Sequence, residues 1–387
     1  MSIAKAICCL ALFLGSAAAV PASGEATGQQ RAQAAGRAIL ESPAPRLTLR
    51  TIDGEVIDLG SLYGKKAVYL KFWATWCVPC RQQMPHFEHA YQTAGPDLAV
   101  IGINVGFNDS IEAVRAYRKK LGISMPIVFD DGSLDAAFHL RVTPTHVVIG
   151  RDGRIQYVGH LADKELDDAL MAARAAGPAA TGAAAGAGEQ GAARASSTSA
   201  SHASPNSDPP PIAVGDLLPR RSLRTLDGQR FELQPGELQP GELQHGRSPQ
   251  HELAHGAPQP KLTVLVFLSP WCESYLATTR PEVSATCRSA REQVSALSGD
   301  PQLRWLGIAS GLWANSEDLR QYRAKYQVTI PLTLDASGEV FRTFRVNDVP
   351  TVLIADAGGR VLRRIEGSAT ADAAALRTAV TAYEHAL

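Results

Sequence analysis

The fold of this chain is decided by the stretch Lys71-Phe72-Trp73-Ala74-Thr75-Trp76-Cys77-Val78-Pro79-Cys80-Arg81. It begins inside an apolar run, residues 67–73, whose length and composition predict a buried strand. Two cysteines three positions apart follow at once, where the pattern becomes helical. The stretch therefore predicts a strand, a turn and a helix, with a pair of thiols at the start of the helix.

The spacing of these two cysteines suits disulfide exchange. At a helix N-terminus, unpaired N–H groups and the helix dipole stabilise a thiolate, so Cys77 is expected to ionise more readily than a free cysteine. Cys80 lies one helical turn further on, within reach of a disulfide. We therefore predict that Cys77 attacks and that Cys80 resolves the mixed disulfide and releases the partner.

Two other interpretations compete with a redox site. His86 and His89 follow the cysteines at a spacing that would suit zinc. On a helix, however, Cys77 and His89 would lie about 18 Å apart, too far to share one ion. A purely structural disulfide is the second alternative, but closing a loop of one turn would add little stability. The redox interpretation is favoured, and no metal site is predicted.

Length and charge set the outline of the molecule. The chain has 387 residues, enough for two domains of ordinary size, and 38 acidic residues balance 38 Lys and Arg. A net charge of zero gives no attraction to nucleic acid or to anionic lipid, so neither is expected as a partner.

The N-terminal sequence predicts export. Lys5 precedes an apolar core, residues 6–14, and small residues suited to signal-peptidase cleavage follow. We assign residues 1–22 to a signal peptide; an uncleaved anchor is the alternative, although the apolar run is short for a membrane span. The expected location is the bacterial periplasm, without stable membrane insertion after cleavage. The mature chain would keep four cysteines: Cys77, Cys80, Cys272 and Cys287.

The rest of the chain divides by composition. Residues 23–44 lack apolar periodicity and predict a flexible leader. Residues 45–174 alternate strand and helix patterns, which predicts a mixed β-sheet covered by helices on both faces. Residues 175–211 are rich in Ala, Gly, Ser and Pro and predict a linker; about 35 residues of flexible coil have an r.m.s. span near 33 Å.

Residues 212–387 repeat the first pattern. Residues 49–54, ending in Asp53-Gly54, return as residues 223–228; Trp76-Cys77 returns as Trp271-Cys272, and Thr143-Pro144-Thr145 as Val349-Pro350-Thr351. The landmarks keep their order, which indicates a tandem duplication. A low-complexity insert, residues 234–260, carries His245, His251 and His255, and we attribute it to a solvated loop rather than to a metal site.

The first domain resembles the periplasmic thiol-disulfide oxidoreductases of the TlpA/ResA type, within the thioredoxin-like superfamily. The resemblance rests on residues 72–81, on Met84-Pro85 and on residues 142–145, and it covers residues 45–172. It implies an α/β fold class with two tandem thioredoxin-like domains, the second one degenerate. It also implies that Pro144 is cis and lies beside the dithiol, where Trp76, Pro79, Thr143 and Pro144 shape the substrate groove.

The same resemblance implies the activity. Protein disulfides would be reduced with electrons from a membrane thiol carrier, in cytochrome c or copper-site assembly, with no cofactor beyond the Cys77/Cys80 disulfide. A binding protein that holds Cu(I) on the two reduced thiols is the alternative, since soft thiolates suit Cu(I).

Two positions depart from the family pattern and are predicted to modulate the site. Gln83 stands where the family usually has glutamate, and Lys71 stands where thioredoxin has a buried aspartate. A desolvated Lys71 could act as a base, whereas a lysine whose amine reaches the surface could not. The resolving step is therefore expected to lack the usual carboxylate.

The second domain departs at its centre. Tyr275 stands where Cys80 would, so Cys272 has lost its one-turn partner. On a continuous helix Cys287 would lie about 22 Å from Cys272; pairing requires a break, which Pro281 permits. A structural role for these cysteines is favoured over a redox or metal role. Because a relay needs a thiol pair, the retained groove at Pro350 predicts a flexibly tethered docking module that presents partners to the first domain.

Overall fold

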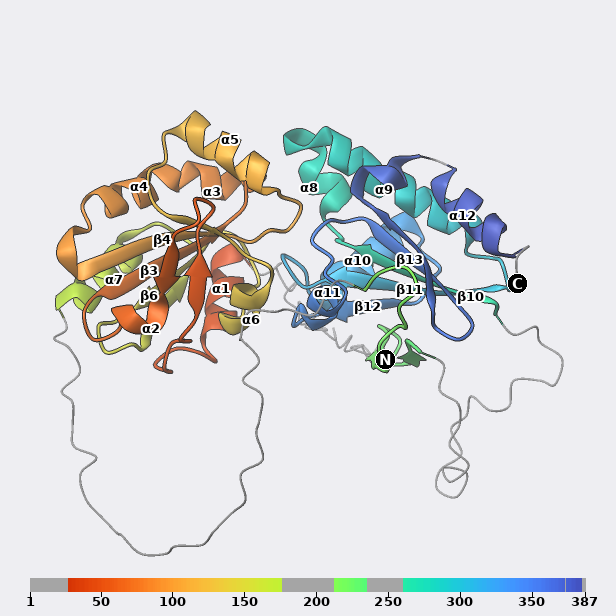
Figure 1. Cartoon of the computed structure of the whole chain (residues 1–387), viewed down its shortest axis with the longest axis horizontal. Helices are drawn as coiled ribbons and strands as arrows, with labels where there is room; N and C mark the ends of the chain where they lie inside the picture. Colours follow the sequence, from red (N-terminus) through yellow and green to blue (C-terminus); the bar gives the residue numbers. More distant parts are fainter. Residues whose placement is uncertain (1–26, 176–211, 235–259, 373, 385–387) are drawn as a thin grey trace, which may run out of the picture.

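The computed structural model describes residues 27–175, 212–234, 260–372 and 374–384, which form two halves lying side by side (Figure 1). The predicted signal peptide lies outside these ranges. So do the predicted linker and insert, apart from their end residues, and with them the three histidines of the insert.

The first half is built on a five-stranded sheet in the order β5-β4-β3-β6-β7. Strand β3 pairs in parallel with β4 and antiparallel with β6, and it is buried along its whole length. A separate hairpin, β1-β2, turns at the predicted Asp53-Gly54. The elements are α1 (Gly28–Gly36), β1 (Thr48–Arg50), β2 (Val56–Asp58), α2 (Leu59–Leu62), β3 (Ala67–Trp73), α3 (Val78–Gln82), α4 (Met84–Gln92), β4 (Leu98–Asn104), α5 (Ile111–Leu121), β5 (Ile127–Phe129), α6 (Ser133–Ala137), β6 (Thr145–Ile149), β7 (Ile155–Gly159) and α7 (Lys164–Ala175).

The second half has the same architecture, with a sheet in the order β12-β11-β10-β13-β14 and the same pattern of parallel and antiparallel pairs. The fold class predicted from the sequence, two tandem thioredoxin-like domains, is confirmed. The elements are β8 (Ser222–Arg224), β9 (Arg230–Glu232), β10 (Leu262–Leu268), α8 (Cys272–Thr279), α9 (Pro281–Leu297), β11 (Leu303–Ser310), α10 (Ser316–Tyr326), β12 (Leu332–Asp335), α11 (Glu339–Thr343), β13 (Thr351–Asp356), β14 (Val361–Glu366) and α12 (Ala375–Glu384).

The predicted flexible leader is wrong over residues 28–36, which form helix α1. Thr27 begins the helix with a capping box. The helix packs on the last strand of the first sheet: Gln29 accepts a hydrogen bond from the N–H of His160 (2.6 Å), and a Cβ on Gly36 would lie 2.5 Å from Cβ of Val158. Only a glycine allows so close an approach.

Tertiary contacts, rather than local sequence, hold this leader helix. The helix is rich in Ala, Gln and Gly and carries little apolar periodicity, so its sequence alone does not predict a packed element. Arg31, on the same helix, also makes an ion pair with Asp318 of the second half (2.9 Å). The leader therefore touches both domains.

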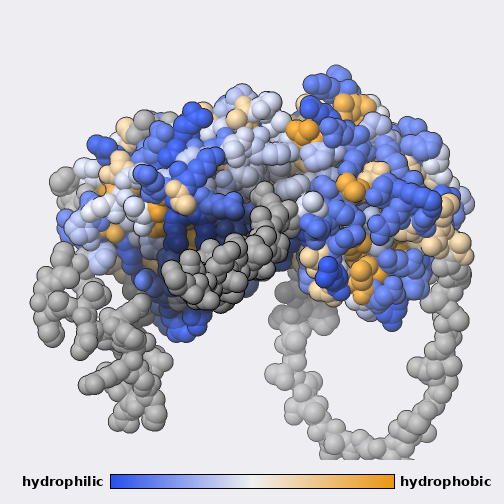
Figure 2. Space-filling view, turned by 180° about the vertical axis from the view of Figure 1, so that it is seen from behind, coloured by the Kyte–Doolittle hydropathy of each residue, from blue (hydrophilic) through white to orange (hydrophobic). Residues whose placement is uncertain are grey.

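Hydrophilic side chains cover most of the face seen from behind, where hydrophobic residues are scattered (Figure 2). Large apolar side chains such as Trp73, Phe87, Phe267 and Phe344 are buried instead. Among the described residues, no helix combines the length and the apolar character needed to cross a membrane.

Candidate active site

The dithiol stands where the sequence places it, at the end of β3 and the start of α3. Cys77 is the N-cap residue of α3, and its Sγ accepts a hydrogen bond from the N–H of Cys80 (3.2 Å). The two cysteines form a disulfide with Cα atoms 5.2 Å apart. Pro79 lies in the first turn of the helix, where its missing N–H costs nothing. Helix α3 ends at Gln82, and the chain bends into α4 before Pro85, as predicted.

Pro144 follows a cis peptide bond, which confirms the prediction for the first domain. It immediately precedes β6, whose first residue, Thr145, pairs with Phe72 of β3. This register places the cis-proline beside the end of the strand that leads to the dithiol. The carbonyl oxygen of Pro144 accepts a hydrogen bond from Nδ1 of His160 (2.7 Å). This bond holds the cis-proline loop against the residue that follows β7.

Lys71 lies fully buried within β3 and does not reach the surface. Its Nζ makes no hydrogen bond within the described part of the chain and lies 5.4 Å from the centre of the Phe87 ring. Burial lowers the pKa of Lys71 from its ordinary 10.5 to about 7. The amine is therefore neutral above about pH 7. Of the two alternatives that the sequence leaves for Lys71, this burial fits the desolvated base and not the amine that reaches the surface.

Gln83 and His146 complete the polar interior under the site. His146 pairs with Lys71 across β3 and β6, and burial, followed by the nearby lysine, lowers its pKa well below the ordinary value. Its Nε2 donates to Oε1 of Gln83 (2.7 Å), and its Nδ1 accepts from the hydroxyl of Tyr69 (2.7 Å). Gln83, in turn, donates to the carbonyl oxygen of His160 (3.1 Å). Gln83 thus links the start of α4 to the cis-proline loop through hydrogen bonds, but its amide cannot act as an acid or a base.

The second domain holds a disulfide that the favoured sequence interpretation does not include. Cys272 and Cys287 are bonded, with Cα atoms 6.3 Å apart. The helix breaks at Arg280, whose φ of −145° and ψ of 71° end α8, and Pro281 opens α9. Cys272 has lost its one-turn partner to Tyr275, as the sequence shows, but the break at Pro281 that pairing with Cys287 requires is present: α9 folds back along α8 and supplies the second thiol.

The loop before each cis-proline is occupied by the other domain. The N–H of Trp313 donates to the carbonyl oxygen of Arg141 (2.7 Å), three positions before the cis-proline of the first domain. In the same way, the N–H of Asn108 donates to Asn347 (2.8 Å), three positions before the cis-proline of the second. Asn108 and Trp313 both have left-handed backbone angles, with φ of 49° and 59°. The two domains therefore dock through equivalent surfaces, related by a pseudo-two-fold axis.

Side chains repeat this relation. Nε1 of Trp313 donates to Oγ1 of Thr143 (3.2 Å), and Oδ1 of Asn108 accepts from the N–H of Val349 (2.8 Å). Thr143 and Val349 are the residues immediately before the two cis-prolines. The second domain itself thus fills the predicted substrate groove of the first domain. In this arrangement it does not present a partner there, as the predicted docking module would.

Two tryptophans that precede the paired cysteines stack on each other at the centre of the interface. The rings of Trp76 and Trp271 lie 5.0 Å apart, tilted by 33°. Each donates its Nε1–H to a carbonyl of its own domain at 2.7 Å, Trp76 to Phe107 and Trp271 to Leu312. Equivalent residues meet each other only on a symmetry axis, so this stack marks the axis.

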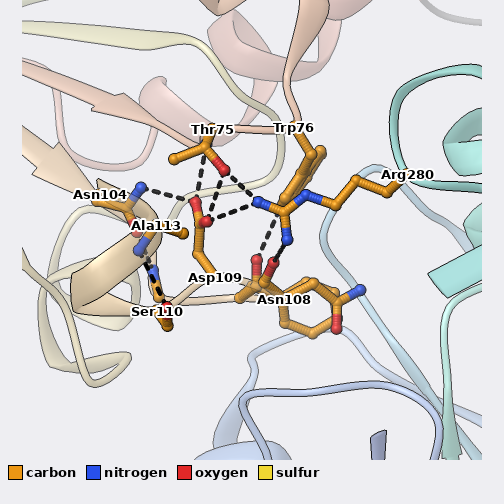
Figure 3. A network of polar contacts seen from close by, with 10 residues as sticks. Thr75, Trp76, Asn104, Asn108, Asp109, Ser110, Ala113 and Arg280 are labelled. Atoms are coloured by element: carbon orange, nitrogen blue, oxygen red, sulfur yellow. Dashed lines mark hydrogen bonds and ion pairs between the residues drawn. The ribbon is translucent and has the colours of Figure 1, made fainter. Parts of the chain in front are cut away.

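A buried ion pair anchors one side of the interface (Figure 3). The carboxylate of Asp109, fully buried, accepts from the backbone N–H of Thr75 (2.8 Å), from Nδ2 of Asn104 (2.9 Å) and from Nη2 of Arg280 (3.0 Å). Nη1 of Arg280 donates to the carbonyl oxygen of Asn108 (2.9 Å). Arg280, at the helix break of the second domain, is therefore bound next to Thr75, two positions before Cys77 of the first domain.

The docked arrangement shields the cysteines. Cys77 is 1% exposed, Cys80 0% and Cys272 1%. No three His, Cys, Asp or Glu side chains gather as a metal site within the described ranges. His86, the zinc ligand of the competing interpretation, lies against Asp167 instead (2.9 Å).

The sequence-based argument missed several residues of the site. His146 is a polar residue inside the otherwise apolar strand that follows Pro144, which is a readable signal. Asp109 and Arg280 lie 171 positions apart and form their pair only because the domains dock. Local sequence carries no signal for such a contact.

A thioredoxin-like sheet whose central strand ends in a C-x-x-C disulfide, next to a cis-proline, defines the class of thiol-disulfide oxidoreductases. Comparison with known proteins agrees: the family model described as AhpC/TSA family matches residues 40–158. The thioredoxin-like protein YneN of Bacillus subtilis (strain 168) is 36% identical over 130 residues, which cover 33% of this chain and 76% of YneN. The chain belongs to this AhpC/TSA family of thioredoxin-like proteins.

Other relatives match over a similar share of the chain. The thiol-disulfide oxidoreductase ResA of the same organism is 33% identical over 116 residues, 30% of this chain and 63% of ResA, so less than two thirds of ResA is spanned. A thiol:disulfide interchange protein of the thioredoxin family from Chlorobium tepidum TLS, solved as a crystal structure, has 30% identity, covers 34% of this chain and 95% of its own, and gives a TM-score of 0.31.

Proposed function

We propose that this chain is an exported reductase of protein disulfides that works through Cys77 and Cys80. The observation that carries the proposal is the Cys77–Cys80 disulfide at the start of α3, above a strand that holds the buried, unpartnered amine of Lys71. Similarity to the thiol-disulfide oxidoreductase ResA supports disulfide exchange at this pair, and the resemblance to the TlpA/ResA type favours the reducing direction. The N-terminal sequence supports export.

The reaction needs two exchanges. The Cys77 thiolate attacks a substrate disulfide, and one substrate sulfur leaves as a thiolate while a mixed disulfide forms on Cys77. Cys80 then gives its proton to the neutral amine of Lys71 and attacks Sγ of Cys77, which releases the second substrate sulfur. Two electrons pass to the substrate, and the Cys77–Cys80 disulfide remains. No further cofactor is required.

The substrate would bind where Trp313 now lies. The carbonyl oxygen of Arg141 and the hydroxyl of Thr143 offer strand-like pairing next to the cis-proline, and both are occupied by Trp313. A protein substrate therefore enters after the second domain has moved aside. We further propose a membrane thiol carrier as electron donor and disulfides of cytochrome c or copper-site assembly as substrates.

The reduction potential of the Cys77/Cys80 pair tests the direction. We expect a value near −270 mV, in the range of thioredoxin, and steady reduction of insulin disulfides that is lost in Cys77→Ser and Cys80→Ser. A potential near −120 mV, as for a strong oxidant, would contradict a reductase.

Cu(I) delivery by the two reduced thiols is the second candidate, favoured only by the softness of thiolate ligands. Tight stoichiometric Cu(I) binding without insulin reduction would establish it in place of the reductase.

A further inference from the structure

The second disulfide occupies the position of a redox centre in its own domain. Cys272 is the first residue of α8, shortly after the strand β10, and Cys77 is the N-cap residue of α3, shortly after β3. Its partner Cys287 comes from α9, and Sγ of Cys287 lies 3.8 Å from the carbonyl oxygen of Val349, immediately before the cis-proline Pro350. The second domain thus keeps a thiol pair beside its cis-proline, with a different residue as the second member.

The docked domains bring the segments that carry the two leading cysteines into contact. Trp76, before Cys77, stacks on Trp271, before Cys272. On the other side of Cys77, the N–H of Val78 donates to the hydroxyl of Tyr275 (3.1 Å), in the first turn of α8. Cys77 is therefore flanked on both sides by contacts to the segment that carries Cys272.

The first domain also reaches the second member of the pair. Asn108 accepts from the N–H of Val349 (2.8 Å), the residue whose carbonyl oxygen touches Cys287. Next to Asn108, Asp109 holds Arg280, at the break that folds α9 back and brings Cys287 to Cys272. The contact that docks the domains and the bend that forms the second thiol pair share one residue.

We propose that Cys272–Cys287 is a second redox centre, which exchanges two electrons with Cys77/Cys80 inside the docked chain; this deepens the proposed function and rests on it. The reduced Cys77 thiolate attacks Sγ of Cys272, and Cys287 leaves as a thiolate. Cys80 then gives its proton to the neutral amine of Lys71, as in the proposed reductase step, and attacks Sγ of Cys77, and Cys272 leaves as a thiolate. The first pair is oxidised to a disulfide and the second is reduced to two thiolates, so the two electrons pass between the pairs without another oxidant or reductant.

Shielding gives this exchange its specificity. Cys77 and Cys272 are both buried in the docked state, whereas Cys287 is partly buried, and the tryptophans that precede Cys77 and Cys272 stack on each other across the interface. The two leading cysteines are therefore shielded from small thiols in solution, and the second domain serves as a protein substrate held next to the first.

The full-length Cys80→Ser variant tests the proposal, because it stops the exchange at the mixed disulfide while Cys272 and Cys287 remain to support folding. After acid quenching and alkylation, cleavage after Glu273 and Glu282 puts Cys272 and Cys287 on separate peptides. We expect most chains to contain a Cys77–Cys272 disulfide with Cys287 alkylated, and Cys77→Ser to give less than a tenth of any equivalent link from Cys80.

Two further variants show whether docking directs the link. Arg280→Glu, added to Cys80→Ser, sets a carboxylate against Asp109 and should lower the yield of the link at least tenfold. Arg323→Glu makes the same change of charge at an ion pair away from the interface, with the more exposed Asp227 inside the second domain (2.8 Å), and should leave the yield unchanged.

Either of two results would overturn the relay: a Cys77 that remains free or bonded only to other molecules, or a link to Cys287 in place of Cys272. The first of these results leaves the proposed reductase intact if the wild-type chain still reduces insulin. Loss of insulin reduction in the wild type would instead remove the proposed function, whatever the internal link shows.

Discussion

Lys71 is the residue on which the chemistry of the first site depends most. A lysine in the middle of a buried strand is costly unless it becomes neutral, and burial accordingly lowers the pKa of Lys71 from its ordinary 10.5 to about 7. A base with such a pKa is well matched to taking a proton from a thiol. Under the proposed function, this amine takes the proton of Cys80 in the resolving step.

Lys71→Met should slow the resolving step and spare the attack. Without a proton acceptor, we expect decay of the mixed disulfide on Cys77 to be slower by about 100-fold at pH 8. Rapid-quench measurement of the mixed disulfide with a small disulfide substrate checks this. Lys65→Met, at an exposed lysine, is the matched control, and equal decay in both variants would show that Lys71 is not the base.

The same variant should change how stability depends on pH. Between about pH 7 and 10.5 the unfolded chain keeps a proton on Lys71 that the folded chain has lost, so stability of the wild type rises with pH in this window. Below pH 7 the cost of the buried amine is present in full, at most ~5 kcal/mol. Lys71→Met should therefore be more stable at pH 7, with this rise removed. Urea unfolding of the first domain at pH 7 and pH 9 measures both effects, and an unchanged rise would disprove them.

Among the elements, the buried strands and the dithiol helix are predictable from sequence. Apolar runs such as residues 67–73 and 262–268 specify central strands, and the bend at Gln83 follows from Pro85. Pro281 permits the break at Arg280 but does not determine it. A proline at the first position of a helix leaves open the direction from which the preceding chain arrives. That direction comes from packing, and with it the second disulfide. Helix α1 escapes prediction for the same reason.

Gly36→Ala tests the docking of this leader helix. Helix propensity alone predicts that alanine stabilises α1 by up to about 1 kcal/mol. The structure predicts the opposite, because the new Cβ would lie 2.5 Å from Cβ of Val158. We expect faster tryptic cleavage after Arg31 and Arg37. Gly299→Ala, at a glycine with open space around it, should leave that cleavage rate unchanged. Slower cleavage in Gly36→Ala would mean that α1 does not pack on β7.

At the scale of the whole molecule, the two domains face each other through the loops before their cis-prolines and the segments that carry Cys77 and Cys272. Equivalent loops exchange equivalent hydrogen bonds, and equivalent tryptophans stack on the axis. Because the second domain lies on the groove, the state of the interface controls access to Cys77.

Arg280→Glu should open the molecule. Its carboxylate would face the buried Asp109 in place of the ion pair, and breaking a buried pair costs about 3–5 kcal/mol. After reduction, we expect a maleimide to modify Cys77 more than tenfold faster than in the wild type. The control Arg323→Glu should react at the wild-type rate. If both variants do so, the arginine does not hold the domains together.

The pseudo-two-fold contact between the domains also bears on the oligomeric state of the protein. Each groove accepts another thioredoxin-like domain, and no described contact requires that domain to belong to the same polypeptide. Joining both domains in one polypeptide raises the effective concentration of each domain for the other, so dilute protein closes on itself. At protein concentrations that approach this value, two chains can trade their second domains and form a reciprocal dimer, in which every interface bond is kept and only chain entropy distinguishes one particle from two.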